Sequence, residues 1–206
     1  MIPSETDTHA NPPAMPRRRI VALTGLVEGG LFVIACFLGL MTDVRFWEGV
    51  ELSMRALAIA FVLTLPLLIG LVAESRSSWP VATRIREDLD RILPLLRNCT
   101  VLDLLVISVL AGAGEEALFR GVFQPFLGGF IGHVPALILV AVLFGAVHPV
   151  SFAYAFFAAA IGLYLGAIQL WLDNLLVPAV IHGLYDFVAL VYLLRIYRQG
   201  QGDDGA

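Results

Sequence analysis

Hydrophobic positions cluster into long runs that are separated by short polar breaks. A helix that crosses a bilayer needs about 20 predominantly apolar residues, and six stretches of the chain come close to that length. They cover residues 20–41, 52–73, 100–127, 134–148, 152–171 and 175–194. The pattern therefore predicts an all-α polytopic membrane protein with about six transmembrane helices.

A different pattern fills the segment 74–98, between the second and third runs. Charged residues such as Arg84 and Arg91 alternate there with apolar residues such as Ile85 and Leu89. This alternation is typical of an amphipathic helix that lies on the membrane surface. We predict such a helix, and a plain charged connector is the alternative.

Composition supports the membrane assignment and excludes a nucleic-acid partner. The 206-residue chain is 59% hydrophobic and only 15% charged, which is more apolar than an ordinary soluble domain. Its net charge is −4 and its longest basic block is the triplet 17–19, so no basic surface for a nucleic acid is expected. Cys36 and Cys99 form no CxxC pattern, so neither a disulfide framework nor a cysteine metal site is expected.

Arginine positions predict the orientation in the membrane. All 13 basic residues are arginines, and ten of them flank the runs on one side, namely Arg17, Arg18, Arg19, Arg76, Arg84, Arg86, Arg91, Arg97, Arg195 and Arg198. The positive-inside rule then places both termini in the cytoplasm. We expect an integral protein of a bacterial inner membrane.

The domain organisation follows from the same pattern. Residues 20–198 are expected to form a single membrane domain, with a motif-bearing core at about 100–195. The polar ends, 1–19 and 199–206, are predicted to be disordered tails, the first of them cytoplasmic.

Three charged residues stand together inside the third apolar run, which makes this stretch a candidate for chemistry. Each ionised side chain at bilayer depth costs at least ~2.5–3.5 kcal/mol, so Glu115, Glu116 and Arg120 are not there for stability alone. Helical residues four apart share a face, so we predict that Glu116 pairs with Arg120. Glu115 then remains available for another role.

Later runs add polar groups that suit hydrolysis. His148 ends the fourth run, and His182 and Asp186 are one helical turn apart in the sixth. A carboxylate and an imidazole can take a proton from water, and a second imidazole with a polar neighbour can stabilise an oxyanion. Alternatively, Glu115, His148 and His182 bind Zn²⁺ with an open position, although no HExxH motif is present. Either histidine alone is also compatible with a packing role.

The ordered motifs resemble a known family. Glu115-Glu116-x-x-x-Arg120, Phe144-x-x-x-His148 and His182-x-x-x-Asp186 are similar to the three motifs of the CPBP family, the CAAX-protease and bacteriocin-processing (Abi) intramembrane endopeptidases. The resemblance covers about residues 102–192. It implies that Glu115 and His148 activate water and that His182 and Asp186 bind the oxyanion. It also implies that Glu116, Arg120 and Phe144 support the site, in a glutamic protease without a metal cofactor.

One position departs from the eukaryotic pattern. The eukaryotic CAAX enzymes carry Asn where this chain has Asp186, and an ionised Asp cannot donate a hydrogen bond to an oxyanion. Asp186 is therefore either held protonated by burial or orients and charges His182. We favour the second role because it requires no unusual protonation state.

The expected function is hydrolysis of a peptide bond near the membrane-anchored end of a protein substrate. The alternatives are a zinc-dependent intramembrane protease, a non-catalytic scaffold or immunity protein, and a transporter that uses Glu115, His148 and His182 as a proton relay. Glu28, in the first run, is predicted to make a polar contact between helices rather than to belong to the site. The sequence leaves the substrate, the membrane face on which the site opens and the oligomeric state open.

Overall fold

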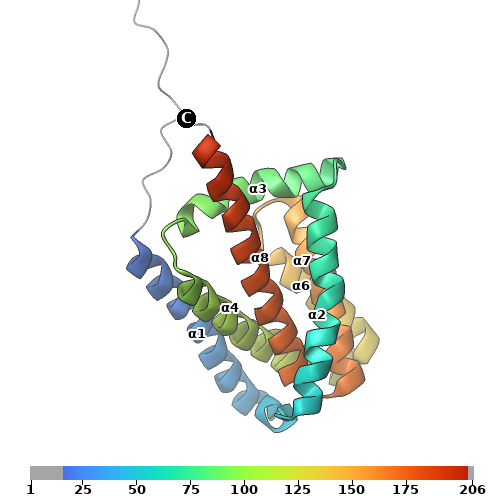
Figure 1. The fold of residues 1–206 in the computed structure, drawn as a ribbon. Helices are drawn as coiled ribbons and strands as arrows, with labels where there is room; N and C mark the ends of the chain where they lie inside the picture. Colours follow the sequence, from blue (N-terminus) through green and yellow to red (C-terminus); the bar gives the residue numbers. More distant parts are fainter. Residues whose placement is uncertain (1–15, 204–206) are drawn as a thin grey trace, which may run out of the picture.

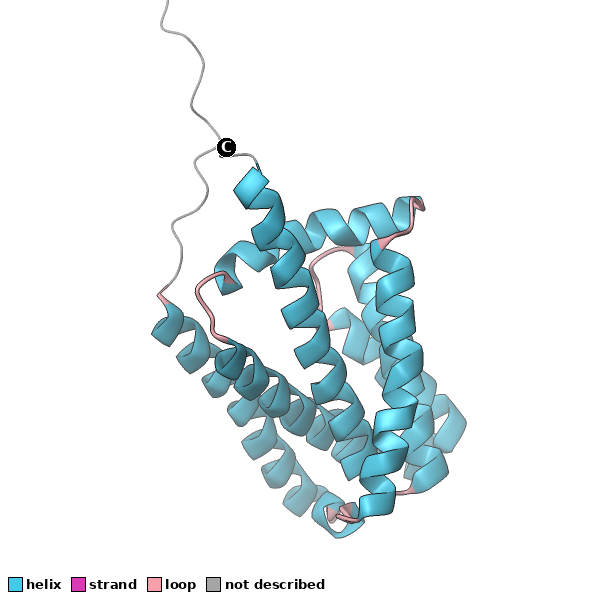
Figure 2. Ribbon diagram, viewed as in Figure 1, coloured by secondary structure: helices cyan, strands magenta, loops and turns pink. Residues whose placement is uncertain are grey.

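The computed structural model describes residues 16–203, and within this range the chain is all-helical (Figures 1 and 2). The elements are α1 (Arg17–Thr42), the short 3-10 helix η1 (Phe46–Gly49), α2 (Met54–Ser75), α3 (Pro80–Leu96), α4 (Val101–Glu116), the π-helical turn η2 (Ala117–Phe123), α5 (Gln124–Ile131), α6 (His133–Ala146), α7 (Phe152–Leu172) and α8 (Leu176–Asp203). The all-α prediction is confirmed.

Four helices, α1, α2, α7 and α8, are long and apolar enough to cross a membrane. A fifth candidate combines α3 with the continuous helix Val101–Ile131, although the two are bent by 118° relative to each other. The predicted fourth run forms α6, whose 14 residues reach only about 21 Å, less than the ~30 Å hydrocarbon core. Residues 16–203 therefore contain four or five candidate spans, and the predicted count of six is not shown.

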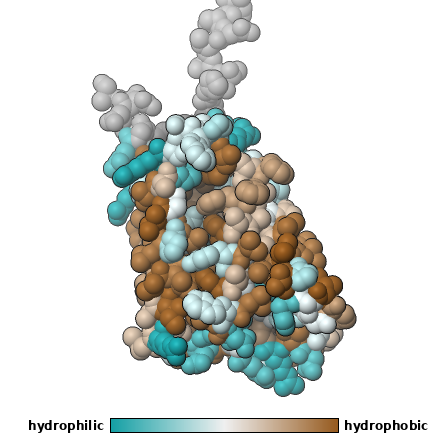
Figure 3. Space-filling view, turned by 90° about the vertical axis from the view of Figure 1, so that its right-hand side faces the viewer, coloured by the Kyte–Doolittle hydropathy of each residue, from teal (hydrophilic) through white to brown (hydrophobic). Residues whose placement is uncertain are grey.

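The surface is that of an integral membrane protein. Large apolar side chains such as Leu26, Phe61, Ile69 and Phe156 are well exposed, whereas a soluble monomer rarely exposes an extended apolar surface. Figure 3 shows hydrophobic residues over the middle of the molecule and hydrophilic ones toward its two ends. This distribution fits a bilayer around the middle of the helices.

Helix α3 occupies the segment where an amphipathic helix was predicted, and Figure 1 shows it running across one end of the molecule. Pro80 stands at its first turn, where a missing N–H costs nothing. Its apolar face is buried through residues such as Ile85 and Leu93, while Arg84 and Arg91 remain exposed. Its location on the membrane surface stays a prediction.

The helix that carries the charged triplet is fixed closely at both faces. Thr100 and Asp103 form a capping box at its start, which satisfies two of the free N–H groups there. A Cβ on Gly112 would lie 2.6 Å from the Ala179 carbonyl oxygen of α8, and one on Gly114 would lie 2.4 Å from the Glu28 carbonyl oxygen of α1. Glycine at both positions therefore lets α4 pack against two helices at once.

The chain ends bear on three predictions. Helix α8 continues to Asp203, so part of the segment 199–206 that was predicted as a tail is helical. Residues 1–15 and 204–206 of the predicted tails lie outside the described residues. Cys36 and Cys99 are both free thiols in the structure.

Candidate active site

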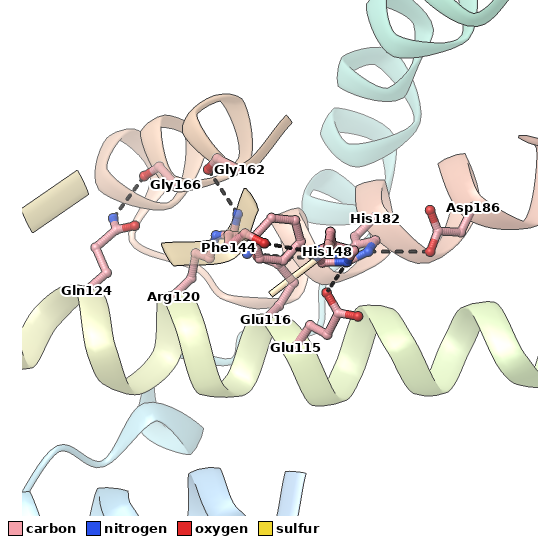
Figure 4. Close-up of polar contacts among 10 residues, drawn as sticks. All are labelled: Glu115, Glu116, Arg120, Gln124, Phe144, His148, Gly162, Gly166, His182 and Asp186. Carbon is pink, nitrogen blue, oxygen red and sulfur yellow. Dashed lines mark hydrogen bonds and ion pairs between the residues drawn. The ribbon is translucent and has the colours of Figure 1, made fainter. Parts of the chain in front are cut away.

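Five predicted site residues line one cavity of about 190 Å³, namely Glu115, Phe144, His148, His182 and Asp186. They come from α4, α6, the turn that follows α6, and α8 (Figure 4). Ile85 and Leu89 of α3 also line this cavity, which we call the catalytic cavity. The catalytic cavity therefore lies at the α3 end of the bundle.

Glu115 and His148 face each other across the catalytic cavity. The Glu115 Oε2 atom lies 3.8 Å from the His148 Nε2 atom, which is longer than a hydrogen bond. His148 Nδ1 is 2.7 Å from the Phe144 carbonyl oxygen, and a carbonyl can only accept, so Nδ1 carries the proton. In the neutral ring Nε2 is then an unprotonated acceptor that points toward Glu115.

Glu116 joins two helices in the interior. Its Oε1 atom accepts a hydrogen bond from Arg120 Nη1 at 2.9 Å and another from His182 Nδ1 at 2.9 Å. All three residues are buried. The predicted pairing of Glu116 with Arg120 is present, and the contact with His182 is an addition that helical spacing within α4 did not reveal.

His182 lies between two carboxylates. Its second nitrogen, Nε2, is 3.4 Å from Asp186 Oδ2, one turn further along α8. Unlike Glu116, the Asp186 side chain is one-third exposed and reaches the catalytic cavity. His182 is thereby fixed at Nδ1, and its Nε2 edge is directed to the cavity.

Arg120 and Phe144 pack next to Glu116 and His148. Arg120 Nη2 donates to the Gly162 carbonyl oxygen at 2.9 Å, and its guanidinium carbon lies 4.3 Å from the centre of the Phe144 ring, a cation–π arrangement. The same ring lies 4.8 Å from the His148 ring. Phe144 therefore contacts both the buried ion pair and the imidazole at the cavity.

The family comparison covers the segment that carries these groups. Residues 97–188 match the family described as Rce1-like, Type II CAAX prenyl endopeptidase Rce1-like. The chain carries an Rce1-like domain. The matched segment contains all three motifs, so the resemblance to the CPBP family is confirmed. No curated protein and no solved structure is significantly similar to the chain.

The Rce1-like domain belongs to a family of CAAX-type intramembrane proteases. It begins just before α4 and ends within α8, so α1 and α2 lie outside it. Helix α2 nevertheless contributes Leu71 and Glu74 to the catalytic cavity. The residues outside the matched segment therefore help to enclose the site.

Gln124 and Tyr154 were missed by the sequence reasoning. Gln124 donates to the Gly166 carbonyl oxygen at 3.0 Å and stands four residues after Arg120, so the spacing that paired Glu116 with Arg120 could have found it. Tyr154 of α7 lines the catalytic cavity beside His148, and no spacing within the sequence indicates that.

The zinc alternative gains no support from the side-chain geometry. Glu115, His148 and His182 border one cavity, but they do not converge. Across the described residues 16–203, no group of three or more His, Cys, Asp or Glu side chains is placed to hold a metal ion.

The contact between helices that was predicted for the Glu28 side chain stays a prediction. Its Oε2 atom is buried, and it has no hydrogen-bond partner within the part of the chain that the structure describes. Its backbone carbonyl instead lies against Gly114 of α4.

Proposed function

We propose that this protein is an intramembrane endopeptidase of the glutamic type, which hydrolyses a peptide bond in a membrane-anchored protein. The observation that supports it most is the Glu115 carboxylate, which faces the unprotonated Nε2 of His148 across 3.8 Å at a cavity. The match to the Rce1-like family, which is described as a CAAX prenyl endopeptidase family, also supports a protease function. No serine, cysteine or metal needs to take part.

Water activation follows from the spacing of the two groups. A gap of 3.8 Å is too long for a direct hydrogen bond, but one water can donate a hydrogen bond to each of these two acceptors. Glu115 and His148 take a proton from this water as its oxygen bonds to the carbonyl carbon of the substrate. The electron pair of the C=O bond moves to the carbonyl oxygen, which becomes the oxyanion.

Stabilisation of the oxyanion falls to His182. Glu116 accepts from Nδ1, so Nε2 is the atom that donates to the oxyanion, and a histidine that is protonated on both nitrogens serves this purpose best. Asp186 at 3.4 Å orients and charges the ring. When the C–N bond breaks, the amine leaves with the proton that Glu115 and His148 return, and the other product is a carboxylic acid.

The cavity lining suits an apolar substrate segment. Leu71, Ile161, Leu190 and Leu193 surround the polar groups, so an extended peptide with apolar side chains would fit against them. Positive-inside orientation places the α3 end in the cytoplasm. The cleaved bond would therefore lie near the cytoplasmic surface of a bacterial inner membrane.

The test is cleavage of a membrane-anchored reporter by the purified protein. Glu115→Ala and His148→Ala are each expected to lower kcat by about 10²–10⁴-fold, the usual worth of a general base. Glu87→Ala is the matched control, because Glu87 is exposed on α3 and its one ion pair within residues 16–203 is with Arg84, also exposed. Near-wild-type cleavage by either active-site variant would refute the proposal.

A further inference from the structure

A second cavity lies at the end of the bundle opposite the catalytic one. Its volume is about 690 Å³, and we call it the vestibule. Arg45, Glu48 and Asp173 are at its charged rim, and Arg120, Gln124 and Gln169 lie deeper in it. In Figure 1 this is the end where α2 begins and α7 turns into α8, away from α3 and from the end of α8.

The vestibule reaches polar atoms that have no protein partner. Gln169 Oε1, Gln124 Oε1 and Arg120 Nε are buried without a hydrogen bond to any residue in the described range 16–203. Gln124 and Arg120 are only 2% and 1% exposed. Native proteins rarely leave such atoms unpaired and commonly satisfy them with ordered water.

The unpaired atoms continue past Arg120 toward the catalytic cavity. Glu116 Oε2 and Glu115 Oε2 are also buried without a partner among the residues that the structure describes. Figure 4 shows Gln124, Arg120 and Glu116 rising from one side of the same helix, and residues four apart on a helix have Cβ atoms about 5–6 Å apart. The polar atoms thus form a row from the vestibule to Glu116, whose neighbour in the chain is Glu115.

Their chemistry matches a file of water molecules. The amide and carboxylate oxygens accept hydrogen bonds and the guanidinium Nε–H donates one, and a water molecule can do both. Gly162 and Gly166 let α7 approach this row closely: a Cβ on Gly166 would lie 2.6 Å from Gln124 Oε1, and one on Gly162 would lie 3.2 Å from Arg120 Nη2. The row therefore lies directly against the α7 backbone, beside Leu137 and Phe144.

We propose that the vestibule is a water inlet, which holds ordered water along Gln169, Gln124 and Arg120 and supplies the hydrolytic water to Glu115. The supply of water to Glu115 rests on the proposed protease function, whereas the presence of water in the vestibule does not. A peptide that fills the catalytic cavity displaces the water there. An inlet from the opposite membrane face delivers water without passing the bound peptide.

Hydration is tested by chemical accessibility. In a background with Cys36→Ala and Cys99→Ala, the variant Gln169→Cys is treated with a charged, membrane-impermeant methanethiosulfonate on oriented vesicles. The thiol reacts as its thiolate, which needs water, so modification from the face opposite the termini is expected. Leu163→Cys is the control, because Leu163 is on the same helix but belongs to the exposed apolar surface. Equal rates at the two positions, or modification of Gln169→Cys only from the side of the termini, would overturn the hydrated vestibule.

Water supply is tested by turnover of the modified protein. Modification of Gln169→Cys narrows the vestibule and is expected to lower kcat about tenfold, a change of barrier well within assay resolution, while KM stays unchanged because the substrate binds in the other cavity. Glu51→Cys, exposed on the same face, is modified as a control and keeps its kcat. Unchanged kcat after full modification of Gln169→Cys would overturn the supply.

The two proposals fail in different ways. If the unmodified protein cleaves no anchored substrate but Gln169→Cys is modified as expected, the protease function and the supply are refuted and the hydrated vestibule is supported. If the protein is an active protease and Gln169→Cys resists the reagent, the vestibule is refuted and the protease function is supported.

Discussion

Glu115 and Glu116 are neighbours in the chain, but their side chains are in different surroundings. The Glu116 side chain is fully buried and accepts hydrogen bonds from Arg120 and His182. The Glu115 side chain is 12% exposed, borders the catalytic cavity and stands 3.8 Å from His148 without a direct bond. Adjacent positions on a helix diverge by about 100 degrees, so one carboxylate can hold helices together while the next remains available for chemistry.

The largest effect on stability is expected at the buried carboxylate. Glu116→Ala leaves the Arg120 guanidinium and the His182 ring without their partner in the interior, and removal of one member of a buried ion pair costs about 3–5 kcal/mol. The free energy of unfolding in detergent micelles would measure this. Glu87→Ala is the control and is expected to change stability by less than about 0.5 kcal/mol. If Glu116→Ala lowered the free energy of unfolding by less than about 1 kcal/mol, well below the cost of breaking a buried pair, the two glutamates would not differ in their contribution to stability.

A smaller effect is expected where α7 meets the polar row. A Cβ on Gly166 would lie 2.5 Å from Leu137 Cδ1 and 2.6 Å from Gln124 Oε1, so Gly166→Ala forces side chains to move at a cost of about 1–3 kcal/mol. Gly129→Ala is the matched control in α5, because nothing lies within 4 Å of a Cβ there. The midpoints of thermal unfolding of both variants are compared. Equal midpoints would show that the side chains around Gly166 move aside without a loss of stability.

No loss of activity is expected from metal removal. Because Glu115 and His148 are proposed to activate water themselves, proteolysis should persist after dialysis against a strong chelator. The matched sample is the same protein dialysed against buffer with zinc added. Activity that disappears with the chelator and returns with zinc would favour the zinc alternative over the glutamic mechanism.

The smallest effect is expected at Glu28. Its carboxylate makes no hydrogen bond through Oε2 within residues 16–203, so Glu28→Gln removes no observed contact and should leave proteolysis largely intact. The kcat of this variant is compared with that of Glu115→Gln in the same assay. A loss as severe as that of Glu115→Gln would show that α1 belongs to the site.

Helical spacing predicted the contacts that lie within one helix. Glu116 with Arg120 and His182 with Asp186 both follow from positions four apart, and both are present. The contact of Glu116 with His182 depends instead on how closely α4 and α8 approach. That approach is set by Gly112, whose Cβ would lie 2.8 Å from the Gly183 nitrogen, and no spacing within one helix encodes it.

The hydropathy pattern predicted where helices form more accurately than which helices are long enough to cross the membrane. The run 134–148 is apolar throughout, but Gly132 turns the chain with a positive φ of 86° just before α6, and His148 lies in the turn after α6. The resulting helix is too short to cross a bilayer alone. The vestibule was not predicted, because the depth of Gln124 and Gln169 inside a cavity is a property of packing.

The most direct test of the account compares Glu115→Gln with Glu116→Gln in one set of preparations. Both the kcat on an anchored reporter and the midpoint of thermal unfolding would be measured for each. The account predicts that Glu115→Gln loses activity and keeps the wild-type midpoint, whereas Glu116→Gln lowers the midpoint. If Glu115→Gln keeps its activity, or if it unfolds as readily as Glu116→Gln, the account of Glu115 as the catalytic and Glu116 as the structural carboxylate is contradicted.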